Sequence, residues 1–423
     1  MADDPSSGER RVTRIPAGLT FAALVGGFGL GFALKAAAPN ALVPVLAVAD
    51  PIGGLWLNAL RITIVPLVMA LLFTGVAQTV EAAQAGRLAR RTVLLFAGVL
   101  FGGAVISAVL TPALLALFPS PGASAAALGA AGAERALVPG FADFVRSLVP
   151  TNIVAAVAAD GILPLTLFTA TFALAAMRIG ETHRGALVAL FKAISEAMLV
   201  IIGWVLALAP IGVFALSVTV VARSGGAAIG ALAHYVALVA LVGSVILIAA
   251  YGIAATLGGQ RLLPFARALL PAQAVALSTQ SSLATLPAML AVCRRLGVRD
   301  DVADLVLPLA VAVFRATGPA MNLAVAIYVA RSLGIGLSPA MLVAGALVAT
   351  LTTLGAVSLP GAVSFISSIG PIALAMGVPV EPLALLIAVE VLPDLMRTLA
   401  NVTMDVAVTT AVDRARQDRP GSH

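Results

Sequence analysis

The chain has 423 residues, of which 61% are hydrophobic and only 10% are charged. A soluble domain carries about 25% charged residues, so this composition excludes an ordinary soluble protein and indicates a surface that largely faces lipid. The net charge is +6, but the arginines lie between apolar segments as topology determinants do, so we predict no nucleic acid partner. A single cysteine and three widely separated histidines exclude a disulfide framework and disfavour a zinc site.

Apolar segments of about 20 residues or more, enough to cross a bilayer, recur along the chain. The predicted order is a cytoplasmic tail (1–16), scaffold spans one and two (17–88), span three (89–118), an external loop (119–142), scaffold spans four and five (143–225), a transport domain (226–412) and a second cytoplasmic tail (413–423). Both termini are placed in the cytoplasm because this arrangement puts most arginine clusters on the inner side. We therefore expect a multi-pass protein of the cell inner (plasma) membrane, in contact with lipid.

Two apolar segments of the C-terminal half carry a polar motif at mid-length. Near 262–298 the motif is Ser-Thr-Gln-Ser-Ser (278–282), and near 336–376 it is Thr-Thr-Leu-Gly (352–355) followed by Leu-Pro-Gly (359–361). Unsatisfied backbone cannot face lipid, so paired interruptions favour re-entrant hairpins that line a site at mid-membrane; kinked ordinary spans are the alternative. The predicted fold is all-α and polytopic, with eight transmembrane helices plus two re-entrant helical hairpins.

The last span, within 389–411, contains five polar residues in an otherwise apolar sequence: Asp394, Arg397, Thr398, Asn401 and Asp405. At about 100° per residue they share one stripe of the helix. Charges inside a span cost about 2.5–3.5 kcal/mol each and normally mark a substrate or ion path. Arg397 offers a planar donor fork for a carboxylate. Asp394 suits an ammonium group, and Asn401 and Asp405 suit Na⁺ or a proton. The alternative is that Asp394 and Arg397 only neutralise each other.

The seventh apolar segment, near 302–330, is interrupted by Phe-Arg-Ala-Thr-Gly-Pro (314–319). A Gly-Pro pair in mid-span predicts a broken helix with free backbone groups. Arg315 is a second cation at membrane depth. It serves either as a fixed positive charge at the site or as a structural partner of an acid such as Asp405 or Glu390, and the sequence does not decide between them.

These motifs resemble, in matching order over residues 15–412, those of the dicarboxylate/amino acid:cation symporters, which include glutamate and aspartate transporters. The resemblance is carried by segments 149–153, 209–215, 281–287, 359–361 and, most closely, 394–405. It implies a homotrimer whose spans one, two, four and five form a scaffold. The other spans and both hairpins would form a transport domain that moves like an elevator.

The resemblance also implies roles for single residues. Arg397 would bind the side-chain carboxylate of the solute, Asp394 its amino group, and Thr398 and Asn401 would contact it. The tips of the hairpins, at Ser281, Ser282 and Gly361, would add backbone contacts. Because the chain has both Arg397 and Asp394, the resemblance favours aspartate or glutamate as the solute.

The chain departs from the family at the broken seventh span. There the family carries Asn-Met-Asp-Gly-Thr, which binds Na⁺, whereas this chain has Phe-Arg-Ala-Thr-Gly (314–318). A guanidinium in place of an anionic ligand repels Na⁺. With Asp405, Asn401 and Arg315 as the candidate ion-binding or coupling residues, we predict Na⁺ coupling that is weakened or replaced by H⁺.

The predicted function is secondary active symport of acidic amino acids or dicarboxylates. We expect a small anionic solute, no enzymatic activity, and no cofactor besides Na⁺ or H⁺ as coupling ion. The alternative is an uncoupled carrier, a channel or a sensor that keeps the transporter fold. A hydrolase based on Ser281 or Ser282 is disfavoured because the only intramembrane base, His234, is not part of a triad pattern.

Overall fold

The computed structural model describes residues 17–84, 86–120, 146, 148–159, 161–224, 227–354 and 361–417. These residues form α-helices, one short 3₁₀ helix and no strand. Seven helical segments among them are long and apolar enough to cross a bilayer. The prediction of an all-α polytopic membrane protein is therefore confirmed, while the count of eight spans stays a prediction. The N-terminal tail, the external loop from residue 121 onward and the tip of the second hairpin (355–360) lie outside the described residues.

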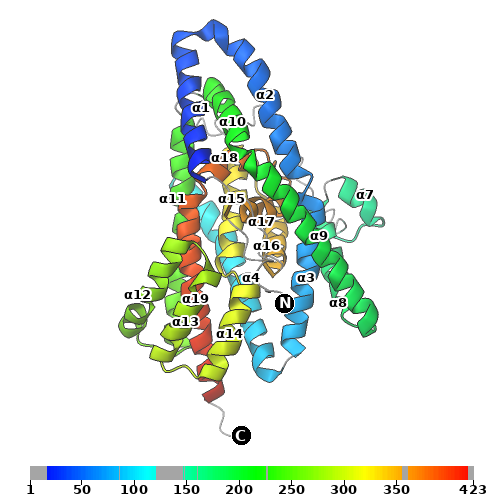
Figure 1. The fold of residues 1–423 in the computed structure, drawn as a ribbon, viewed down its shortest axis with the longest axis vertical. Helices are drawn as coiled ribbons and strands as arrows, with labels where there is room; N and C mark the ends of the chain where they lie inside the picture. The colour runs from blue at the N-terminus through cyan, green and yellow to red at the C-terminus, as the bar shows by residue number, and fades with distance from the viewer. Residues whose placement is uncertain are drawn as a thin grey trace, which may run out of the picture.

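Seven described helices belong to the parts of the chain predicted as scaffold. They are α1 (Ala17–Ala37), α2 (Pro39–Arg61), α3 (Ile64–Gln84), α7 (Ile153–Ala158), α8 (Ile162–Ala176), α9 (Glu181–Ala207) and α10 (Ala209–Ser224). Helices α1 and α2 pack against α10 at one end of the molecule, and α3 packs against α8 and α9 (Figure 1). Gly212 lies against the Trp56 ring, whose indole N–H donates to the Val205 carbonyl at 2.8 Å. A small residue at this contact lets the helices approach closely.

Helix α2 contains two internal prolines. It begins at Pro39 and continues through Pro44 and Pro51. Membrane helices tolerate such prolines because neighbouring groups satisfy the freed carbonyls. The chain then bends at Ile62 and Thr63 before α3 starts.

The remaining helices surround the broken seventh segment. They are α4 (Arg87–Leu117), α11 (Ala227–Thr256), α12 (Leu262–Thr279), α13 (Ser282–Arg295), α14 (Asp300–Val313), α15 (Thr317–Ser332), α16 (Pro339–Leu354), α17 (Gly361–Ala375), α18 (Leu383–Leu386), η2 (Ile387–Val389) and α19 (Val391–Gln417). Helix α15 is buried along almost its whole length and packs against α4, α11, α16 and α17. It is the central element of the molecule, and its broken start is therefore shielded on all sides.

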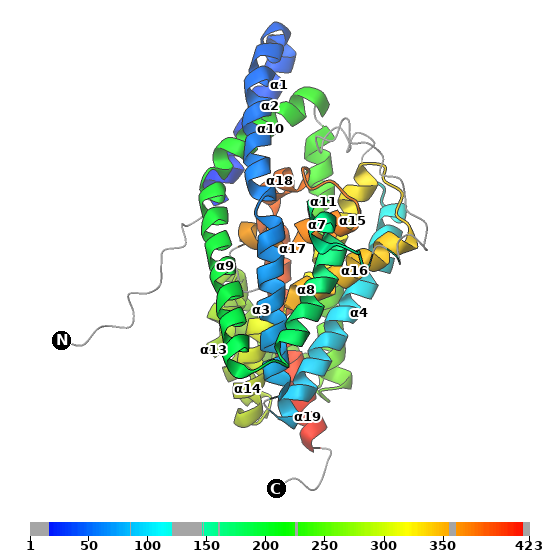
Figure 2. The ribbon, with the colours of Figure 1, turned by 90° about the vertical axis from the view of Figure 1, so that its right-hand side faces the viewer.

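Each of the two segments with a polar motif forms a pair of helices packed on each other, α12 with α13 and α16 with α17. The chain reverses between α12 and α13 at Gln280, whose φ of 51° is left-handed. Helices α16 and α17 lie between α15 and α3 (Figure 2). The second pair thus contacts both the centre of the molecule and α3, a helix of the predicted scaffold.

Candidate functional site

The seventh segment breaks between Val313, where α14 ends, and Thr317, where α15 begins. Phe314 anchors the break by stacking on Phe96 of α4, with ring centroids 4.1 Å apart and planes 6° from parallel. The next residue, Arg315, lies in the break between α14 and α15, and its neighbours Phe314 and Ala316 are buried. The broken helix that the Gly-Pro pair predicted is present.

A side chain from the last helix caps the start of α15. The Asn401 side-chain oxygen accepts hydrogen bonds from the Thr317 backbone N–H and from the Thr317 hydroxyl, both at 2.9 Å. The cap satisfies donors that a helix start leaves open, and the positive end of the helix dipole points into the same region. In this conformation the Asn401 oxygen is therefore occupied by two donors, not free for a cation.

Arg397 of α19 is buried and holds three partners. Its guanidinium donates to the Asn322 side-chain oxygen and to Glu390, each at 2.7 Å, and its Nε lies 3.2 Å from Asp394. Glu390 is buried as well and accepts a second hydrogen bond from the Tyr235 hydroxyl at 2.7 Å. Asp394 and Arg397 do pair at i and i+3, but the pair is one part of a network that joins α11, α15 and α19.

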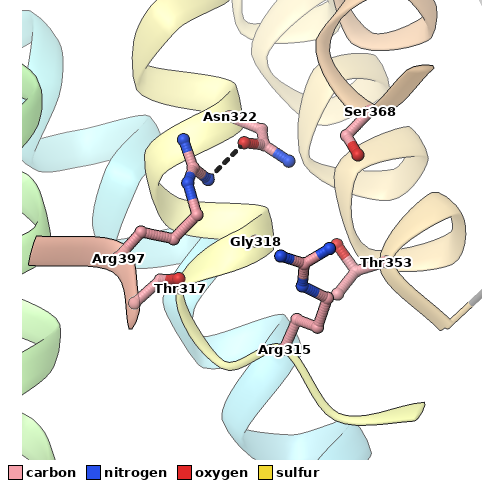
Figure 3. A pocket seen from close by; sticks show the side chains of 7 residues that line it. All are labelled: Arg315, Thr317, Gly318, Asn322, Thr353, Ser368 and Arg397. Carbon is pink, nitrogen blue, oxygen red and sulfur yellow. Dashed lines mark hydrogen bonds between the residues drawn. The ribbon is translucent and has the colours of Figure 1, made fainter. Parts of the chain in front are cut away.

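A small cavity lies beside this network. Arg315, Thr317, Gly318, Asn322, Thr353, Ser368 and Arg397 line it. Figure 3 shows Arg397 and Arg315 on different sides of the start of α15, with Thr353 of α16 beside Arg315 in this view and Ser368 of α17 farther away. Its volume is about 10 Å³, about the space that one water molecule requires. The structure therefore shows the site in a closed form, without room for an organic solute.

Two other residues predicted on the last span, Thr398 and Asp405, do not line this cavity. Thr398 donates its hydroxyl to the backbone carbonyl of Asp394 at 3.0 Å. Asp405 is buried, and its Oδ1 has no hydrogen-bond partner among the described residues. Its carboxylate interacts electrostatically with Arg315. The stripe on α19 thus faces the protein interior and not lipid.

The residues predicted at the hairpin tips lie at the starts of helices α13 and α17. Ser281 caps α13, because its hydroxyl oxygen accepts from the Ala284 backbone N–H at 3.2 Å. Ser282 is the first residue of α13. Neither serine lines the cavity in this conformation. Gly361 is the first residue of α17, and the tip that precedes it lies outside the described residues.

Sequence reasoning missed Asn322 and Ser368 and gave Glu390 no more than a structural role. Asn322 lies in α15, which is buried and largely apolar. Only its position soon after the break in the seventh segment indicates that it belongs to the site. Glu390 precedes the polar stripe and belongs to the turn between η2 and α19. A carboxylate at membrane depth next to the stripe is the signal that would have found it.

Comparison with known proteins agrees with this site. The model of the sodium:dicarboxylate symporter family matches residues 17–415. A proton/glutamate-aspartate symporter of Escherichia coli is 30% identical over 369 residues, which cover 85% of this chain and 83% of the relative. A proton/sodium-glutamate symport protein of Bacillus subtilis is 28% identical, covering 84% of this chain and 83% of the relative.

A C4-dicarboxylate transport protein of Rhodopseudomonas palustris is also 28% identical, covering 83% of this chain and 79% of the relative. The match extends over nearly the whole chain and includes both helical hairpins and the last span. The chain therefore belongs to the sodium:dicarboxylate symporter family, a family of secondary transporters and not of enzymes.

Proposed function

We propose that the protein is a symporter that carries acidic amino acids or dicarboxylates across the cell inner membrane. The observation that carries this proposal is the buried Arg397 guanidinium, which lines a cavity at the broken start of α15. A guanidinium fork binds a carboxylate at two points, and the positive end of the α15 dipole favours an anion in the same place. The named relatives transport glutamate, aspartate or C4-dicarboxylates.

The experiment that tests this role is ligand-dependent thermal stabilisation of the purified protein. Aspartate, glutamate and succinate should each raise the unfolding temperature of the wild type in proportion to the logarithm of their concentration. Replacing Arg397 leaves Glu390 and Asp394 without their cation and destabilises the fold. The informative variant is therefore Arg397→Lys, which keeps the charge and loses the fork.

The matched control is Arg331→Gln, at the exposed far end of α15. Arg397→Lys should lose stabilisation by these solutes, while Arg331→Gln should keep it. Equal stabilisation of all three proteins would exclude Arg397 from solute binding. Stabilisation of none of them by any acid would argue against the proposed solute class.

We propose that H⁺ replaces Na⁺ as the coupling ion. Arg315 places a positive charge at the break, and the Asn401 oxygen is already used by two donors. The Asp405 carboxylate has one buried oxygen without a hydrogen-bond partner among the described residues. A buried carboxylate of this kind is stable when it carries a proton or faces a cation. Asp405 is therefore our candidate for the coupling residue.

Uptake into proteoliposomes tests the coupling ion. We expect an inwardly directed proton gradient to drive solute accumulation and a sodium gradient to have no effect on it. Asp405→Asn, which imitates the protonated acid, should bind solute but no longer accumulate it. Steep dependence on Na⁺ would overturn the proposal, and downhill flux without any coupling would favour the uncoupled carrier or channel.

The elevator mechanism, the homotrimer and the cytoplasmic position of both termini complete the proposal. The contacts that support a division into two bodies are those of α1 and α2 with α10 and of α3 with α8 and α9, set against those of α15 with α4, α11, α16 and α17. Native mass spectrometry in detergent tests the trimer, and labelling of cysteines placed near each terminus tests the topology.

A further inference from the structure

The charge balance around Arg397 is unfavourable for an anion if that arginine acts alone. Its guanidinium is paired with the carboxylates of Glu390 and Asp394, at 2.7 and 3.2 Å. When Glu390 and Asp394 are both ionised, one positive charge against two negative charges leaves this cluster with a net negative charge. A solute carboxylate that approaches it meets repulsion that a low-dielectric interior strengthens. Binding an anion here therefore needs a further positive charge.

Arg315 lies where that charge is needed. Its side chain lines the same cavity as Arg397 and approaches it from the break between α14 and α15 (Figure 3). Its charge interacts with those of Asp394 and Asp405 as well as with that of Arg397. Thr353 of α16 and Ser368 of α17 add hydroxyl groups to the same wall. Two guanidinium groups and two hydroxyls thus converge on one small space.

Asp394 is less suited to recognise a solute ammonium than its sequence position suggests. One of its carboxylate oxygens is bound to Arg397 Nε, and its side chain is only 13% exposed. The residues that line the cavity supply two cations, an amide and hydroxyls, and no carboxylate is among them. This chemistry fits two carboxylates better than a carboxylate and an ammonium.

From this arrangement we infer that Arg315 is a specificity-determining residue that binds the second carboxylate of the solute, so that the site selects dicarboxylates whether or not they carry an amino group. The inference rests on the proposed function and narrows it. Arg397 holds one carboxylate and Arg315 the other, with the solute lying across the start of α15. Arg315 then acts on the solute directly and not only through the coupling ion.

The test compares solutes that differ by one group on proteins that differ by one guanidinium. The three probes are succinate, aspartate and succinamate, in which an amide replaces one carboxylate of succinate. The measured quantity is the dissociation constant, from calorimetry on the protein in nanodiscs. The proteins are the wild type, Arg315→Gln, Arg315→Lys and the control Arg331→Gln. Arg315→Lys retains the charge and serves if the neutral variant does not fold.

We expect the wild type and the control to bind succinate about tenfold or more tightly than succinamate, the size of effect that a charge-assisted hydrogen bond gives. In Arg315→Gln this ratio should fall toward one, because a single guanidinium remains. Arg315→Lys should show an intermediate ratio. Aspartate should bind the wild type no more than about tenfold tighter than succinate, since the amino group adds little.

Three results would overturn the inference. In the first, Arg315→Gln weakens succinate and succinamate equally, which would assign Arg315 a general electrostatic role. In the second, neither affinity changes in Arg315→Gln, which would show that Arg315 does not contact the solute. In the third, aspartate binds the wild type far more tightly than succinate, which would show that the amino group is recognised. If no acid of any kind binds the wild type, the proposed function itself fails, which is a distinct outcome.

Discussion

The contact between α15 and α16 at the cavity makes Gly318→Ala an informative substitution. A Cβ at Gly318 would lie 2.8 Å from Thr353 Oγ1 and 2.9 Å from its Cγ2, both closer than such contacts allow. Thr353 cannot easily turn away, because its hydroxyl donates to the Ala349 carbonyl at 2.7 Å. A methyl group at Gly318 therefore requires α16 to move away from the break.

Two opposing free-energy contributions determine how much Gly318→Ala changes stability. Overpacking a tight contact costs about 1–3 kcal/mol, whereas replacing glycine by alanine in a helix gains up to about 1 kcal/mol. The contact term dominates, so Gly318→Ala should destabilise the closed conformation by about 1–2 kcal/mol. Solute affinity should not fall, because the closed conformation that the variant destabilises has no room for a solute.

The control is Gly98→Ala in α4, where no neighbouring atom lies within 4 Å of the added Cβ. It should unfold at the wild-type temperature or slightly above, because only the helix-propensity term acts. Thermal unfolding and solute affinity are measured for both variants. They are also measured for Thr353→Ala and for the double variant Gly318→Ala/Thr353→Ala, in which the clashing atoms are gone and part of the loss should be recovered. Wild-type stability in Gly318→Ala would refute the close packing of α16 on the break.

Three further substitutions probe contacts that the site depends on. Tyr235→Phe removes a donor from buried Glu390 and should lower the free energy of unfolding by about 1–3 kcal/mol, measured by denaturation in detergent; no change would mean that this hydrogen bond is absent. Asn401→Ala removes the cap of α15 and should cost about 1 kcal/mol or more, with faster hydrogen exchange confined to the start of that helix; uniform exchange would contradict the cap. Arg61 and Glu381 form an exposed ion pair at 2.9 Å between α2 and the loop before α18. Glu381→Gln should therefore change the free energy of unfolding by less than about 1 kcal/mol. If transport breaks this pair in each cycle, the same variant should raise the uptake rate up to about fivefold. An unchanged rate would show that breaking this pair does not limit transport.

The sequence predicted the polar stripe on the last span well, because a helical period of 3.6 residues relates Asp394, Arg397, Asn401 and Asp405 within one regular element. Each of these residues lies in or beside the network described for α19. The Gly-Pro pair likewise predicted the break that positions Arg315. Local rules were sufficient where the chemistry belongs to a single helix.

Side-chain contacts between different helices could not be predicted from the sequence in this way. The pairing of Arg397 with Asn322 joins residues 75 positions apart, and that of Tyr235 with Glu390 joins residues 155 apart. No periodicity crosses a break or a connecting loop, so the partners of each polar group depend on packing. The serines of the first hairpin illustrate the same limit, since Ser281 caps its own helix in this conformation and does not reach the cavity.

The closed cavity indicates which wall must move to admit a solute. Arg397 is held by three partners, and Arg315 follows a phenylalanine that is stacked on α4. These two sides are therefore fixed by contacts that are costly to break. The remaining wall consists of Thr353 from α16 and Ser368 from α17, which belong to the second pair of helices. Because a space for about one water cannot hold a dicarboxylate, we expect opening to displace α16 and α17 together, away from α15 and toward α3.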